Sequence, residues 1–278
     1  MRVEDLTTGF DGRVAAEVAA GQLADLDALG LTHDGDVVRQ SERRDLYDDA
    51  IARLVDAGRT YPCFCTRREI REASSAPHGP HPDGAYPGTC STLSRSRVRE
   101  LQREGRRPAL RLRADRVEVT ATDVLAGPMI AEVDDLVLRR ADGQVAYNLA
   151  VVVDDAEQGV GQVVRGDDLW ETTPRHVRLQ QLLGLATPEY LHVALVVGPD
   201  GSRLAKRDGA VTLGDRLAMG EDAATVIGML AHSAGLAERG ERLTADDVAS
   251  RFDVGRLRRE PWVFDGGPMR ETRGRDPR

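Results

Sequence analysis

Residues 161–184 read GQVVRGDDLWETTPRHVRLQQLLG, and this stretch carries signals for a strand, a turn and a helix in immediate succession. The β-branched residues predict a strand over 161–165, and Gly-Asp-Asp at 166–168 predicts the turn that follows it. Thr173 is a suitable N-cap, and Pro174 suits the first helical position because an N–H would have no partner there. We therefore expect a strand followed by a helix that ends at the final glycine.

The segments on either side repeat this alternation. After Ser41, apolar residues recur at spacings of three and four up to Gly58, which is typical of a helix with one buried face. We expect further helices over 14–29, 94–105 and 222–254, the last with a cap at Thr244. We expect strands over 109–119 and 192–197. We also expect a hairpin in which residues 136–140 pair with the chain from Val145 across an Ala-Asp-Gly turn. Strands that alternate with helices indicate an α/β protein with a mostly parallel sheet.

Composition narrows the class of protein. The chain has 278 residues, of which 41% are hydrophobic and 30% charged, and its formal net charge is −8. Its apolar runs are too short to cross a membrane, and three cysteines exclude a disulfide framework and suit a reducing compartment. The acidic balance argues against a protein that coats nucleic acid without specificity. We expect a cytoplasmic protein, monomeric and without a membrane partner.

Two arginine-rich segments stand out in this acidic chain. Residues 94–116 contain nine arginines and three acidic residues, a net charge of +6, and a second cluster comprises Arg256, Arg258 and Arg259. Such a segment could line an RNA backbone. It could equally be the solvated face of a helix, since runs of charge usually face water.

All three cysteines fall within residues 61–90, a proline-rich segment with little hydrophobic periodicity. Cys63 and Cys65 form a Cys-x-Cys pair, and Cys90 follows after a long interval. Three soft ligands in a lobe without a core of its own fit a tetrahedral structural zinc site. The alternative is three buried, reduced cysteines.

The residues alone leave the fourth zinc ligand open. His78 and His81 are the conventional candidates in this segment. Tyr86 is a third candidate, because a zinc ion lowers the pKa of its ligands strongly enough to ionise a phenol.

Residues 198–211, GPDGSRLAKRDGAV, combine glycines with the basic residues Arg203, Lys206 and Arg207. A loop of this kind can hold phosphates whose charge changes during a reaction. The alternative is a solvated loop with surface charges. Lys206 is the only lysine among 38 basic residues, which favours a specific role for its compact ammonium group.

Several segments together resemble the glutamyl-tRNA synthetase group of class I aminoacyl-tRNA synthetases, and in particular its short bacterial paralogues. The matching segments are RVEDL (2–6), YPCFCTRREI (61–70), GAYPGTC (84–90), YNLAVVVDDAEQGVGQVVRGDDL (147–169), TPRHVRLQQLLG (173–184) and RLAKRDGA (203–210). They occur in the order that the family shows and span nearly the whole chain.

The resemblance implies a Rossmann-type α/β catalytic domain that is interrupted by a zinc-binding insertion and followed by a short helical unit. The expected parts are the first half of the catalytic domain (1–60), the insertion with the zinc lobe and an acceptor-contacting region (61–135), the second half with a KMSKS-like loop (136–215), a helical stem-contact-like unit (216–265) and a flexible tail (266–278). The family's zinc pattern falls on Cys63, Cys65, Tyr86 and Cys90 and so favours Tyr86 as the fourth ligand.

The resemblance also implies a reaction. Glutamate and ATP, with Mg²⁺, form glutamyl-adenylate and pyrophosphate, and in the short paralogues the glutamyl group then passes to queuosine in the anticodon of tRNA(Asp). Glu4 matches the carboxylate that receives the ammonium group of glutamate, while Tyr147 and Arg165 match the groups that bind its carboxylate end. Lys206 is the expected catalytic lysine. The ATP-binding loop corresponds to Arg203, Leu204, Ala205, Lys206 and Arg207.

The residues by themselves allow other readings of this site. Tyr147 could be a core aromatic residue, and Arg165 could pair with Asp167 or Asp168. A fixed guanidinium aided by a hydroxyl donor is, however, a suitable receptor for an anionic side chain.

The sequence departs from the family at its start. The family's first strand, its glutamate-binding loop and its HIGH-type ATP motif all precede the segment that matches RVEDL, and the sequence as read from Met1 contains none of them. An internal methionine taken as the start is the simpler explanation, and we expect the chain as given to be impaired in activation. A catalytically inactive RNA-binding or regulatory paralogue and a truncated glutamyl-tRNA synthetase are the two alternatives.

Overall fold

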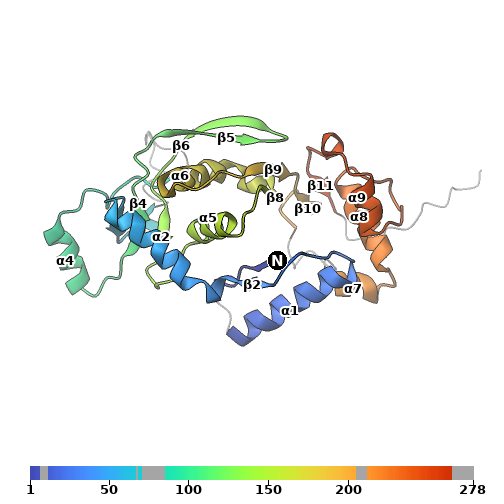
Figure 1. Cartoon of the computed structure of the whole chain (residues 1–278), viewed down its shortest axis with the longest axis horizontal. Coiled ribbons are helices and arrows are strands. Elements are labelled where there is room, and N and C mark those ends of the chain that lie inside the picture. Colours follow the sequence, from blue (N-terminus) through green and yellow to red (C-terminus); the bar gives the residue numbers. More distant parts are fainter. Residues whose placement is uncertain (7–11, 67, 71–84, 205–211, 265–278) are drawn as a thin grey trace, which may run out of the picture.

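A computed structural model describes residues 1–6, 12–66, 68–70, 85–204 and 212–264. Figure 1 shows an elongated molecule, with helix α4 at one end, helices α8 and α9 at the other, and the longest strands between them. None of the described helices has the length and apolar character needed to cross a lipid bilayer.

The largest sheet is four-stranded and mixed, in the order β6-β5-β9-β8. Its strands are β5 (Glu118–Asp123), β6 (Gly127–Glu132), β8 (Gln162–Gly166) and β9 (Glu189–Val193). Strand β9 pairs in parallel with β8 and with β5, whereas β5 and β6 form an antiparallel hairpin. The predicted parallel pairing is confirmed for β8, β9 and β5, whereas β6 adds an antiparallel strand at one edge.

Three helices pack against one another and form the main core, and the last of them also contacts β5 and β6 of this sheet. They are α2 (Arg44–Asp56), α5 (Tyr147–Glu157) and α6 (Thr173–Leu183), with the short 3-10 helices η1 (Gln40–Glu42) and η2 (Asp167–Thr172). The expected hairpin at 136–145 is reduced to a single bridge between Arg139 and Val145, after which the chain enters α5. The run of valines in α5 is buried against α2 and α6, so tertiary packing overrides the β propensity of valine.

A smaller antiparallel sheet supports the cysteine lobe. It contains β3 (Thr60–Cys63), β4 (Ala109–Leu112) and β7 (Val137–Arg139), and α4 (Arg95–Arg103) begins at the N-cap Ser94. The prediction of one strand over 109–119 is wrong, because β4 and β5 belong to different sheets. Asp115 and Arg116 between them adopt φ angles of 64° and 50°, which turn the chain from one sheet into the other.

A short strand stands near the start of the sequence. Strand β1 (Arg2–Val3) pairs in parallel with β2 (Val38–Arg39), and α1 (Gly12–Ala28) connects them. The side chain of Arg2 then ties β1 to α5, because its Nη1 donates to Asp155 Oδ1 at 2.6 Å and to Gln158 Oε1 at 3.0 Å.

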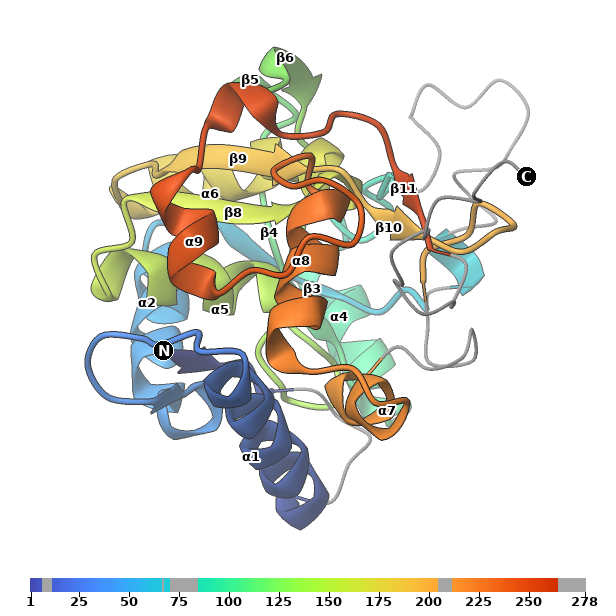
Figure 2. The same ribbon diagram turned by 90° about the vertical axis from the view of Figure 1, so that its right-hand side faces the viewer.

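The C-terminal part is mainly helical, as predicted, and lies in front in Figure 2. It contains α7 (Leu213–Ala218), α8 (Ala223–Ser233), α9 (Ala245–Ser250), η4 (Val254–Arg256) and the parallel pair β10 (Val196–Val197) and β11 (Trp262–Val263). Thr244 caps α9 in a capping box with Asp247, which confirms the predicted cap. The strand predicted over 192–197 is divided between β9 and β10, so that one segment serves two sheets.

Candidate functional site

A cavity of about 760 Å³ opens between β1 and β8 and contains three of the predicted substrate-binding residues. Glu4 reaches it from the end of β1, Tyr147 from the first turn of α5, and Arg165 from the end of β8. These residues are up to 161 positions apart in the sequence (165 − 4), and the fold brings them to one cavity. The three residues therefore line one cavity, and the role of each in binding glutamate stays a prediction.

Glu4 is held by a neighbour that the sequence analysis did not single out. Its Oε1 accepts from Nε and Nη2 of Arg2, at 3.2 Å and 3.0 Å. Because Arg2 is itself anchored to Asp155, the Glu4 carboxylate is joined to α5 through one guanidinium. The carboxylate is still 40% exposed, which leaves it accessible to a cation in the cavity.

Tyr147 is not a core residue, so that alternative is wrong. Its relative exposure is 47%, and its ring lies 6.2 Å from the ring of His176. The surrounding protein raises the pKa of the phenol, the Glu4 carboxylate raises it further, and Arg165 opposes the rise. The hydroxyl therefore stays protonated near neutral pH and can donate a hydrogen bond.

Arg165 does not pair with either neighbouring aspartate, and this alternative is also wrong. Asp168 instead accepts from Nη1 of Arg203 at 2.9 Å. Arg165 Nη2 donates to Oγ1 of Thr173 at 2.7 Å. Thr173 is the first residue of α6 rather than its N-cap, since Thr172 occupies the cap position without a side-chain cap bond.

Only part of the predicted ATP loop lies within the described residues. Arg203 forms an isolated bridge with Val197, and Leu204 packs beside Leu213 and Phe264. Ala205, Lys206 and Arg207 lie outside the described residues, so the predicted role of Lys206 stays a prediction.

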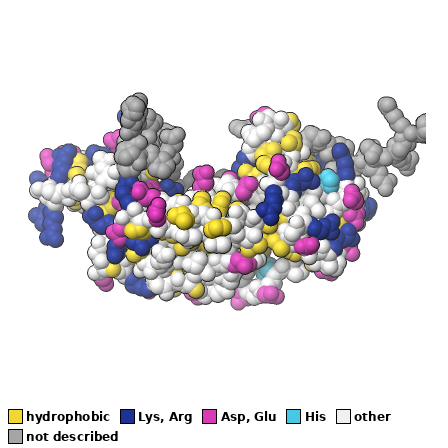
Figure 3. All heavy atoms as spheres, turned by 90° about the horizontal axis from the view of Figure 1, so that it is seen from above, with side chains coloured by type: hydrophobic (Ala, Val, Ile, Leu, Met, Phe, Trp, Pro, Cys, Tyr) yellow, Lys and Arg dark blue, Asp and Glu magenta, His cyan; other side chains and the backbone are white. Residues whose placement is uncertain are grey.

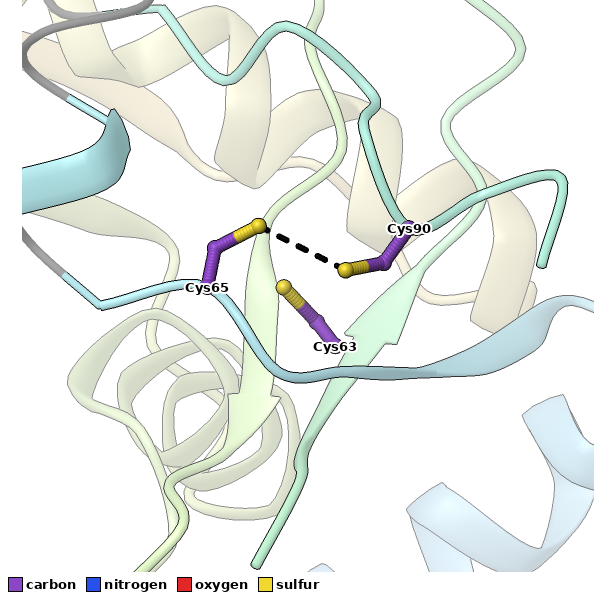
Figure 4. A group of neighbouring side chains, drawn as sticks. All are labelled: Cys63, Cys65 and Cys90. Atoms are coloured by element: carbon purple, nitrogen blue, oxygen red, sulfur yellow. Dashed lines mark hydrogen bonds between the residues drawn. The ribbon is translucent and has the colours of Figure 1, made fainter. Parts of the chain in front are cut away.

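The three cysteine sulfur atoms converge in the lobe beside β3, as Figure 4 shows. They lie within 4.8 Å of one another, and the sulfurs of Cys65 and Cys90 are 3.4 Å apart. The hydroxyl of Tyr86 lies 3.3 Å from the sulfur of Cys63 and 3.8 Å from that of Cys65. A tetrahedral metal needs donors at this mutual spacing, so this donor set could hold one. His78 and His81 lie outside the described residues.

The local chemistry favours a thiolate at one of these positions. Burial alone would raise the pKa of Cys63, but hydrogen bonds from Tyr86, the Cys65 backbone and Arg111 lower it below its usual value. Burial and the nearby Cys90 raise the pKa of Cys65 to about 12. The guanidinium carbon of Arg111 also lies 3.7 Å from the centre of the Tyr86 ring. This positive charge favours a negatively charged group among the three cysteines and Tyr86.

Sequence reasoning missed the polar residues behind Arg165. Asp123, His176 and His192 are buried and belong to three different elements. The sequence did contain a signal for His176. Thr173, His176 and Gln180 recur at spacings of three and four, which places polar side chains on the buried face of α6.

The fold is that of a class I tRNA synthetase catalytic domain. The sequence profile of the family described as tRNA synthetases class I (E and Q), catalytic domain, matches residues 1–271. The chain belongs to this family, and it is a ligase of the aminoacyl-tRNA synthetase type.

Curated relatives and solved structures agree with this placement. A glutamyl-Q tRNA(Asp) synthetase from Nocardia farcinica is 54% identical over 273 residues, which cover 98% of this chain and 84% of the relative. The protein of the same name from Symbiobacterium thermophilum is 43% identical and covers 94% of this chain and 84% of the relative. A glutamate tRNA ligase from Elizabethkingia meningosepticum, solved in complex with its amino acid, superimposes with a TM-score of 0.72 at 24% identity. That match covers 95% of this chain and 60% of the ligase, and it shows the likeness of the fold.

Proposed function

We propose that this chain activates glutamate with ATP and transfers the glutamyl group to queuosine in the anticodon of tRNA(Asp). The convergence of Glu4, Tyr147 and Arg165 on one cavity supports glutamate as the substrate. The names of the 43–54% identical relatives support queuosine in tRNA(Asp) as the acceptor.

Each residue has a physical part in this proposal. The exposed Glu4 carboxylate receives the ammonium group of glutamate, and the Arg165 guanidinium with the Tyr147 hydroxyl receives the carboxylate of its side chain. The other carboxylate of glutamate attacks the α-phosphate of ATP, giving glutamyl-adenylate and pyrophosphate, and the acyl group then passes to queuosine with release of AMP. Lys206 steadies the phosphates of ATP, with Mg²⁺ as the accompanying ion.

The acceptor is tested by transfer of labelled glutamate with ATP to three forms of tRNA(Asp). We expect transfer to the queuosine-containing form, no transfer to the form that lacks queuosine, and undiminished transfer to a queuosine-containing form without its terminal adenosine. Transfer that requires the terminal adenosine would overturn the proposal in favour of a glutamyl-tRNA synthetase. Binding of tRNA without glutamate-dependent exchange between ATP and pyrophosphate would favour the inactive RNA-binding paralogue.

Zinc is the proposed occupant of the cysteine cluster, with a structural role. The soft thiol donors of Cys63, Cys65 and Cys90 suit zinc, and the Tyr86 hydroxyl is the fourth donor in reach. The ion would join β3 to the segment around Cys90 and so stabilise a lobe whose apolar cluster is small.

A Cys90→Ser variant tests this zinc site. We expect one zinc ion per chain in the unchanged protein and loss of that ion in the variant, because a hydroxyl is a far weaker zinc ligand than a thiolate. Metal analysis by mass spectrometry gives the stoichiometry, and a Ser91→Ala variant one position further along is the control. Equal zinc content in the Cys90→Ser variant would contradict the site.

A further inference from the structure

Within the part of the chain that the structure describes, the hydrogen-bond partners of Arg165 are neutral groups. Its Nε donates to Nε2 of His192 at 3.0 Å, its Nη1 lies 3.2 Å from Nδ1 of His176, and its Nη2 donates to Oγ1 of Thr173 at 2.7 Å. A longer contact of 3.4 Å joins Nη2 to the carbonyl of Leu169. Among the described residues, Arg165 forms no ion pair with a carboxylate, although it makes four hydrogen-bond contacts with other groups.

The partners of the two histidines fix their protonation. Asp123 Oδ2 lies 2.8 Å from Nδ1 of His192 and also accepts from the His192 backbone N–H at 2.7 Å. Asp123 Oδ1 accepts from two further backbone N–H groups, so the carboxylate is fully engaged and ionised. Nδ1 of His192 must therefore carry a proton and donate it to Asp123, which leaves the lone pair on Nε2 to accept from Arg165.

The same reasoning applies to His176 on the other side of the guanidinium. Its Nε2 lies 2.9 Å from Oδ1 of Asn148, an acceptor, so Nε2 carries the proton. Nδ1 then accepts from Nη1 of Arg165. A doubly protonated ring in either position would turn an N–H toward an N–H of Arg165. Burial lowers the pKa of both histidines, that of His176 to about 3, which agrees with neutral rings.

Among residues 1–6, 12–66, 68–70, 85–204 and 212–264, no carboxylate forms an ion pair with Arg165 at the wall of the cavity. A guanidinium has five N–H donors, and the contacts above use four of them. The remaining N–H, on Nη1, is not used by these contacts. Arg165 also interacts with the hydroxyl of Tyr147, and both groups line the same cavity. An incoming carboxylate would thus supply the missing negative charge and accept from both groups.

We infer that His176 and His192, with Thr173, are positioning residues that hold Arg165 through neutral acceptors and so reserve its charge for the side-chain carboxylate of the substrate. The inference rests on the proposed glutamate site and deepens it. A carboxylate in place of any of these acceptors would neutralise Arg165 in advance, and the site would lose its preference for an anionic side chain over an amide.

The matched variants His176→Asn and His176→Asp test this inference, since both place an oxygen near the position of Nδ1 and they differ in charge. Calorimetric titration with L-glutamate and with L-glutamine measures affinity without requiring catalysis. We expect His176→Asn to keep the affinity for glutamate within about threefold. We expect His176→Asp to lose roughly 10- to 100-fold for glutamate, the scale of one charged hydrogen bond, with little change for glutamine.

The outcomes separate the inference from the function on which it rests. Suppose that the unchanged protein binds glutamate. If both variants then bind glutamate equally well, or if both variants lose affinity for glutamate and for glutamine together, the positioning role is overturned. The proposed function stands in either case. If the unchanged protein does not bind glutamate, the proposed function falls and the inference falls with it. If thermal unfolding shows that His176→Asp does not fold, the variants Thr173→Asn and Thr173→Asp replace this pair. They compare a neutral with a charged oxygen acceptor near the position of the Thr173 Oγ1.

Discussion

At the scale of single residues, Tyr147 offers a direct test of the site because its hydroxyl and its ring have separable roles. A Tyr147→Phe change keeps the ring and removes the donor. We expect the affinity for glutamate to fall roughly 10-fold, the scale of a hydrogen bond to a charged group. Since the residue is half exposed, we expect the free energy of unfolding to change by less than about 0.5 kcal/mol. Calorimetry and denaturant titration measure the two effects. A large loss of stability with unchanged affinity would make Tyr147 a packing residue after all.

His176 predicts a specific dependence of stability on pH. Burial first, and then the charges of Arg165 and Arg175, lower its pKa from 6.5 to about 3 in the folded state. Between these values the unfolded chain binds a proton that the folded chain does not. The free energy of unfolding therefore falls as the pH drops below about 6.5, by up to about 1.4 kcal/mol for each pH unit.

The variant His176→Asn isolates this contribution, because asparagine keeps an acceptor for Arg165 and does not titrate in this range. We expect its free energy of unfolding to fall less steeply than that of the unchanged protein when denaturant titrations are compared between about pH 7 and about pH 5. Parallel pH profiles for the two proteins would show that His176 is protonated equally easily in both states.

The residues that could be predicted from the sequence are those that carry a motif. Glu4, Tyr147 and Arg165 lie in segments that resemble a family, and the structure places all three at one cavity. The groups that orient them could not be found in this way. Arg2 reaches Asp155 across 153 positions, and Asp123 reaches His192 across 69, so these contacts exist only once the chain is folded.

At the scale of elements, α8 depends on a glycine for its packing. A Cβ built on Gly228 would lie 1.7 Å from the backbone oxygen of Glu241, which cannot move independently of the chain. Although alanine favours a helix, we expect Gly228→Ala to lower the free energy of unfolding by more than about 2 kcal/mol, because the overlap must force α8 and the loop apart.

Gly21→Ala in α1 is the matched control for that change. A Cβ on Gly21 meets no atom within 4 Å, so only helix propensity changes, and we expect a gain of about 0.5–1 kcal/mol. Denaturant titration of the two variants gives opposite signs if close packing at Gly228 is decisive. If both variants changed the free energy of unfolding in the same direction, the contact between α8 and the loop at Glu241 would have to relax easily.

The elements also show where sequence patterns were insufficient. The valine run of α5 has the composition of a strand, yet its buried residues pack on all sides between α2 and α6. In 109–119 apolar residues alternate with charged ones on both sides of Ala114 and Asp115, and the break at Asp115 and Arg116 lets the chain enter a second sheet. Local propensity predicted the kind of element in most segments, whereas the sheet to which a strand belongs is decided by distant partners.

At the scale of the whole molecule, charge is distributed unevenly. The chain has a net charge of −8, yet Figure 3 shows basic side chains gathered at the end of the molecule that carries α4. Arg95, Arg99 and Arg103 recur every four residues and so share one face of this helix, and all three are exposed. Arg97, by contrast, pairs with Glu100 at 2.7 Å. This face lies beside the cysteine lobe and is the strongest candidate for contact with the RNA backbone.

The dependence of tRNA binding on salt concentration tests this face. Each phosphate contact releases counter-ions, so the slope of log affinity against log salt reports how many contacts form. We expect the double change Arg99→Gln and Arg103→Gln to weaken tRNA binding and to reduce the slope by roughly 1.5–2. The control Arg242→Gln removes an exposed arginine of the C-terminal part that already pairs with Asp222 at 2.5 Å, and its slope should stay close to that of the unchanged protein. Equal slopes for all three proteins would identify the arginines of α4 as a solvated helix face, and the contacts with RNA would then have to lie on another part of the molecule.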